Sequence, residues 1–160
     1  MADADAIALP HWERGTPTVL VVAGLHAIPV STAVRAGDRR LLLALGRRRD
    51  TLARLRADPG VALCLLGRHV AVTVRARARV VEEELPEAPV TAVLLEVDRV
   101  QDHLADGRTE MLDGARWRWR DPNAAEQDAR AAAGLARLAE KLGPARCTGS
   151  ESTRRDGDDA

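Results

Sequence analysis

Residues 39–63 read RRLLLALGRRRDTLARLRADPGVAL, a stretch that contains a strand, a basic turn, a short helix and the start of another strand. Leu41 to Leu45 is apolar without interruption, which is typical of a strand buried on both faces. The segment from Arg49 to Ala57 has leucines on one side and predicts a helix, with Asp50 as its cap and Pro59-Gly60 as its stop.

The basic turn consists of Arg47, Arg48 and Arg49. A strand that leads basic side chains and free backbone N–H groups into a helix start is suited to binding an anion. Guanidinium groups bind phosphate bidentately, and a helix N-terminus adds partial positive charge. The alternative interpretation of the same three residues is a merely exposed basic turn.

The flanking sequence is rich in predicted strands. Between Val70 and Val80 the even positions are apolar, and arginine occupies positions 75, 77 and 79, which predicts a strand with one buried and one wet face. Pro29 marks an edge or a bulge in its strand, because proline cannot donate to a ladder. The other predicted strands are 16–23, 26–34, 39–45, 61–66, 90–100 and 109–120.

These elements predict a mainly β (α+β) fold, a small mixed barrel with one short helix after its third strand. Asp121 and Pro122 begin a C-terminal helix that runs to Gly143. We expect an N-terminal arm over residues 1–15, one domain over 16–143 and a disordered polar tail over 144–160. A second copy of the chain is expected to cover leftover apolar edges.

Composition narrows the function. The 160 residues carry 24 basic and 24 acidic side chains, so no basic excess favours nucleic acid as a partner. No apolar run is long enough to span a membrane, and residues 1–10 do not resemble a secretory signal, so a cytoplasmic protein is expected. Cys64 and Cys147 lie far apart and suggest no metal site.

The serial order of several motifs resembles the pyridoxamine 5′-phosphate oxidase-like family, the FMN-binding split barrels. The resemblance extends over about residues 16–120. It rests on the motifs His26-Ala27-Ile28-Pro29-Val30-Ser31, Arg39 to Leu45, Gly46 to Leu63, Val70 to Val80 and Val97 to Val100.

This resemblance implies a homodimeric flavoprotein oxidoreductase that acts on a small-molecule substrate, with two FMN sites at the dimer interface. It places Ser31 and Thr32 beside the flavin or its ribityl chain, and Ala44 and Leu45 in contact with it. Arg49, with Arg47 or Arg48, would hold the phosphate. Thr51 occupies the position where the family usually has lysine. Trp117 offers a broad π face for stacking on a flavin, with core or interface packing as its alternative role.

Two alternatives remain open at this point. The deazaflavin F420 is the first, because the arginines at 75–79 offer a basic groove for its longer acidic tail. The second is a degenerate, non-catalytic dimeric binding module, which Asp50 and Thr51 favour because they replace basic residues of the family pattern. In a flavoprotein the cofactor performs the electron chemistry, so no catalytic side chain is predicted.

Overall fold

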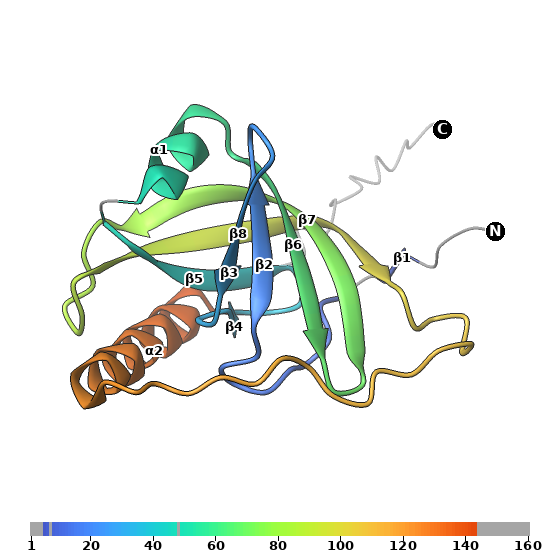
Figure 1. Cartoon of the computed structure of the whole chain (residues 1–160). Helices are drawn as coiled ribbons and strands as arrows, with labels where there is room; N and C mark the ends of the chain where they lie inside the picture. Colours follow the sequence, from blue (N-terminus) through green and yellow to red (C-terminus); the bar gives the residue numbers. More distant parts are fainter. Residues whose placement is uncertain (1–4, 7, 48, 144–160) are drawn as a thin grey trace, which may run out of the picture.

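The computed structural model describes residues 5–6, 8–47 and 49–143, and in this part of the chain one curled antiparallel sheet is accompanied by two helices (Figure 1). The elements are β1 (Asp5–Ala6), β2 (Thr18–Val22), β3 (His26–Val30), β4 (Val34–Arg35), β5 (Arg40–Gly46), α1 (Asp50–Ala57), β6 (Gly60–Gly67), β7 (Val70–Glu82), β8 (Val90–Asp102) and α2 (Pro122–Leu142).

The strand order is β3-β2-β6-β7-β8-β5-β4, with β1 added to the end of β8. Every pairing is antiparallel, and the sheet curls so that β2, β3 and β6 cross the direction of β5, β7 and β8 (Figure 1). No described strand joins β3 to β5, so the barrel is split along this line. The predicted mainly β split barrel with a C-terminal helix is therefore confirmed. Pro29 lies in the edge strand β3, as predicted.

The apolar runs in β5 and β8 reflect burial on both faces. Leu43, Val93 and Leu95 point into the barrel, where they are fully buried, whereas Leu42 and Leu94 point outward and are covered by α2. β7 alternates instead, because the arginines on its outer face meet solvent. The sequence pattern of each strand thus reports whether a helix covers its outer face.

Helix α2 packs against β5 and β4 through Leu135 and Leu138, which lie on the same face of the helix. Its N-cap is Asp121, whose side chain accepts a hydrogen bond from the Asn123 N–H at 2.9 Å, and Pro122 occupies the first turn. Gly143 ends the helix with φ of +62°. The predicted start and end of this helix are confirmed.

Arg137 joins α2 to the end of β7 and the β7–β8 connection. Its guanidinium lies 2.6 Å from Glu87 Oε1 and 3.1 Å from Glu82 Oε2, and it lowers the pKa of the Glu87 carboxyl below its ordinary value of 4.5. The same two carboxylates raise the pKa of Arg137. This three-residue cluster adds ionic contacts to the apolar packing of α2 on the sheet.

The lowered pKa of Glu87 makes folding stability depend on pH. A carboxyl whose pKa is lower in the folded chain stabilises the fold above its unfolded pKa, and this contribution disappears as the pH falls through the folded value. We expect urea midpoints to fall between about pH 6 and about pH 3, and Glu87→Gln to show a smaller fall over that range. An identical fall in the two proteins would contradict this role for Glu87.

Residues 103–121, called the strap below, run from β8 to α2 without forming a strand. The predicted strand over 109–120 is therefore wrong, because alternation alone makes no strand when no sheet edge is alongside. The strap crosses the lower end of the barrel (Figure 1) and is bonded to it by the His69 N–H, which donates to Met111 O at 2.9 Å.

The remaining predictions concern the ends of the chain. Part of the predicted arm is ordered against the barrel, since Leu9 is buried in the inner core. The predicted tail over 144–160 lies outside the described residues. Neither α1 nor α2 has both the length and the apolar composition that crossing a bilayer requires, within the part of the chain that the structure describes.

Candidate functional site

A pocket of about 270 Å³ opens where the two edges of the split sheet approach each other. The edge strand β3 forms one side, the end of β5 forms the floor, and the first half of α2 forms the opposite wall. It is lined by Ile28, Pro29, Val30, Ser31, Thr32, Ala44, Leu45, Gly46, Arg49, Val90, Trp119, Ala124, Gln127, Asp128 and Ala131. Five of the nine predicted cofactor-binding residues thus line one pocket: Ser31, Thr32, Ala44, Leu45 and Arg49.

The gap between the two strand edges beside this pocket, called the seam below, is bridged by the Thr32 side chain. The Thr32 hydroxyl donates to Ala44 O at 3.1 Å and accepts from the Ala44 N–H at 3.1 Å. On this edge β5 otherwise pairs only with the short β4, through Leu41 and Leu42, so no strand covers the backbone beyond Ala44 within the described sheet. Thr32 is therefore occupied in closing the barrel, and open strand edges face the pocket.

The three arginines of the basic turn have different surroundings. Arg47 forms an ion pair with Glu84, with Nη1 2.7 Å from Oε2, and points away from the pocket lining. Arg48 lies outside the described residues. Arg49 lines the pocket and lies over Gly46, and it has no carboxylate partner in the described part of the chain. Arg49 is the arginine of this turn that is placed to meet a ligand in the pocket.

Asp50 does not cap α1, contrary to the prediction. The N-cap is Arg49, which makes no side-chain cap hydrogen bond, while the Asp50 carboxylate lies 2.7 Å from Arg54 Nε one turn further along. That hydrogen bond lowers the pKa of Asp50 and keeps its charge paired on the side of the helix. The helix start beside Arg49 is therefore left without a capping side chain.

Thr51 is fully buried and does not line the pocket. Its hydroxyl lies 3.1 Å from His26 Nε2, so this side chain joins the first turn of α1 to the start of β3. Thr51, at the position where the resemblance predicts lysine, thus links α1 to the barrel.

Trp117 and Trp119 lie together on the strap, in a T-shaped arrangement with ring centroids 5.2 Å apart and an 88° angle between planes. Trp119 lines the pocket at the seam, whereas Trp117 lies on the other side of the pair and donates its indole N–H to Gly15 O at 2.9 Å. The predicted stacking residue Trp117 is therefore one ring removed from this pocket.

The wall formed by α2 was not foreseen. Gln127 and Asp128 reach the pocket because Leu135 and Leu138 fix the helix on the outer face of β5. The sign of this wall in the sequence is the apolar runs of β5 and β8. Apolar residues on both faces of these strands indicate that another element covers the outer face. The sequence contains no local sign of which residues of that helix would meet the seam.

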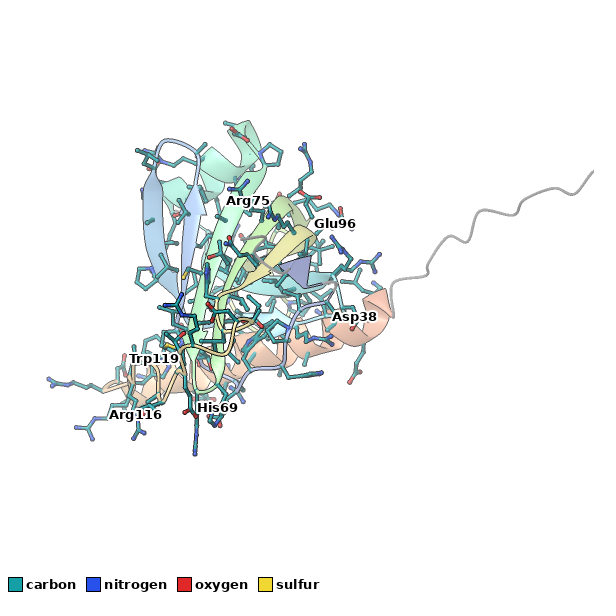
Figure 2. The ribbon with its side chains drawn as sticks, turned by 90° about the vertical axis from the view of Figure 1, so that its right-hand side faces the viewer. Asp38, His69, Arg75, Glu96, Arg116 and Trp119 are labelled. Atoms are coloured by element: carbon teal, nitrogen blue, oxygen red, sulfur yellow. The ribbon has the colours of Figure 1, made fainter. Side chains whose placement is uncertain are left out.

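The three arginines expected to hold the acidic tail of F420 lie outside the pocket at the seam. Arg75, Arg77 and Arg79 project from the outer face of β7, and none of them lines the pocket at the seam. Figure 2 shows Arg75 and Glu96 in the upper part of the molecule and Trp119 in the lower part. In the described residues, no group of three His, Cys, Asp or Glu side chains is placed to hold a metal ion.

Comparison with known proteins gives structural similarity only. No protein-family model matches the sequence, and no curated protein matches it significantly. Among solved structures, an NADH:FAD oxidoreductase from Streptomyces globisporus is 17% identical over 68% of this chain and 87% of its own, with a TM-score of 0.48. A protein from Listeria innocua, provisionally assigned as a pyridoxamine 5′-phosphate oxidase, is 12% identical over 55% of this chain and 88% of its own, with a TM-score of 0.46.

A third similar structure is an F420 reductase, 11% identical over 56% of this chain and 91% of its own, with a TM-score of 0.46. The likeness to pyridoxamine 5′-phosphate oxidase-like proteins that the sequence predicted is thus found again among solved structures. It concerns the arrangement of strands, and what this chain binds has to follow from its own residues.

Proposed function

We propose that the pocket at the seam binds FMN and that the protein is a flavin-dependent oxidoreductase. One observation supports this most strongly. Arg49 is the described arginine of the basic turn without a carboxylate partner, and it lines the same pocket as the apolar end of β5. An apolar lining beside an available guanidinium suits a ligand with an aromatic ring at one end and a phosphate at the other.

The dimensions suit partial enclosure of the cofactor. A pocket of about 270 Å³ is small for a site that encloses a whole ligand of this kind. Ala44, Val90 and Ala131, which line the pocket, would contact the isoalloxazine ring, and Arg49 would hold the ribityl phosphate. The uncapped start of α1 adds partial positive charge at the same rim.

When bound, FMN supplies the hydride and electron chemistry. The chain's own residues hold it in place. Arg49 would bind the phosphate, Ala44 and Val90 would keep water from part of the ring, and Gln127 would offer both a donor and an acceptor to its polar edge. Thr32 keeps the two strand edges at a fixed separation. The homodimer implied by the resemblance stays a prediction, as does the substrate.

Titration with FMN, followed by quenching of flavin fluorescence, tests the proposal. We expect saturable binding by the wild-type chain and at least a roughly tenfold higher Kd for Arg49→Ala, the loss of about one charge-assisted hydrogen bond. Arg47→Ala is the matched control, because Arg47 belongs to the same turn but pairs with Glu84. Its Kd for FMN is expected to equal that of the wild type.

Two results would contradict the proposal. If FMN fails to bind at about millimolar concentration, near the weak end of measurable affinity, the chain is better described as a binding module that has lost its cofactor. If Arg49→Ala and Arg47→Ala weaken binding equally, the phosphate is not held by Arg49. If F420 binds and FMN does not, the pocket is a deazaflavin site and not an FMN site.

A further inference from the structure

A second pocket of about 420 Å³ lies on the other side of the tryptophan pair. Three segments distant in sequence meet there: the arm before β2, the β6–β7 turn and the strap. The aromatic and charged residues of its lining are Trp12, Glu13, Arg14, Arg68, Asp113, Arg116 and Trp117. The volume is typical of small-molecule sites, and the proposed function makes no use of this pocket.

Two indole rings form fixed walls of this pocket. The Trp12 indole N–H donates to Ala33 O at 3.0 Å, and the Trp117 indole N–H donates to Gly15 O at 2.9 Å. Because both N–H groups are bonded to backbone carbonyls, the rings are held in place before any ligand arrives. What they offer to a ligand is flat apolar surface, which suits a planar aromatic group.

The charges around these walls favour an anion. Asp113 is paired with Arg116, whose Nε lies 2.9 Å from Oδ2, and it also accepts from the Gly114 N–H. Arg14 and Arg68 form no ion pair within 4.0 Å in the described part of the chain. The pKa of Asp113 is lowered by its hydrogen bonds with the Gly114 N–H and Arg116, and further by the nearby charge of Arg68. Glu13 is the one further acid in the lining. The lining thus carries three guanidinium groups, Arg14, Arg68 and Arg116, against the carboxylates of Glu13 and Asp113, which leaves a net positive charge.

We infer that this second pocket binds a small aromatic anion, a planar ring that carries a phosphate or a carboxylate. The ring packs against Trp12 and Trp117, and Arg14 and Arg68 hold the anionic group. Trp117 lines this pocket and Trp119 lines the pocket at the seam, and their ring centroids lie 5.2 Å apart. Figure 2 shows Arg116, Trp119 and His69 together at this end of the molecule.

Isothermal titration of the full-length, FMN-free chain with phenyl phosphate tests this inference, with benzoate as the carboxylate arm. We expect saturable binding of at least one of the two, and a Kd at least about tenfold higher in Arg68→Ala. Arg118→Ala is the matched control, since Arg118 belongs to the strap but does not line the pocket. Benzyl alcohol, which has the ring without the charge, is expected not to bind.

The inference is overturned if neither aromatic anion binds, if Arg118→Ala weakens binding as much as Arg68→Ala, or if benzyl alcohol binds equally well. Inorganic phosphate that binds as tightly as phenyl phosphate would also overturn it, because the rings would then contribute nothing. The two sites are distinguishable: Arg49→Ala is expected to bind the aromatic anion normally, and Arg68→Ala to bind FMN normally. A failure of FMN to bind therefore leaves this test intact.

Discussion

Leu43→Ala is expected to lower the free energy of unfolding by about 2–5 kcal/mol, the usual cost of truncating a buried leucine. Leu43 is completely buried at the centre of β5, opposite Val93 of β8, and packs in the core that fills the barrel. The core contains no tyrosine or phenylalanine, so aliphatic side chains fill it, and the strands around the resulting cavity are held by their ladders. Urea denaturation monitored by circular dichroism measures the loss.

Leu66→Ala is the matched control for Leu43→Ala. It makes the same chemical change on β6, where the side chain is 44% exposed on the outer face of the sheet. Its expected cost is at most about 1 kcal/mol, since little apolar area is lost from the interior. Equal losses in the two variants would show that the barrel interior is not the main source of stability.

Gly114→Ala is expected to destabilise the chain by about 1–3 kcal/mol, the range for steric overfilling at a close contact. A methyl group at this position would lie 2.6 Å from Leu66 O and 3.1 Å from the Gly67 Cα, both backbone atoms at the end of β6. Backbone cannot turn aside as a long side chain can, so the strap has to move outward. Hydrogen exchange at the His69 amide, which donates to Met111 of the strap, is expected to accelerate.

Gly46→Ala is the matched control for Gly114→Ala. Its methyl group would meet only the flexible Arg49 side chain, at 3.4 Å and beyond. We expect stability close to that of the wild type and unchanged exchange at His69. If Gly114→Ala is as stable as Gly46→Ala, the strap is not held by backbone contact, and the second pocket has no fixed wall on that side.

The sequence predicts the barrel well where local pattern and burial coincide. The alternation from Val70 to Val80 matches β7, and the apolar run from Leu41 to Leu45 matches a strand buried on both faces. Arginine and tryptophan also alternate from Arg116 to Arg120, but this segment has no neighbouring strand edge and lies in the strap. Which strands pair depends on the whole fold, so a local sequence pattern does not predict the pairing.

The site was predictable in part for the same reason. Arg49, Ala44 and Leu45 follow one another closely in the chain, and local order brings them to one pocket. Arg47 belongs to the same basic turn, but its position depends on Glu84, which is 37 residues away. The contributions of Gln127 and Asp128 depend on how α2 docks, a packing outcome that no short motif encodes.

The placement of the three tryptophans has an optical consequence. Because the chain has no tyrosine and no phenylalanine, these indoles account for its near-ultraviolet absorption and its intrinsic emission. Trp12 and Trp117 line one pocket and Trp119 lines the other. The molecule therefore carries a built-in fluorophore at each pocket, and occupancy of either one can be followed on the unlabelled protein.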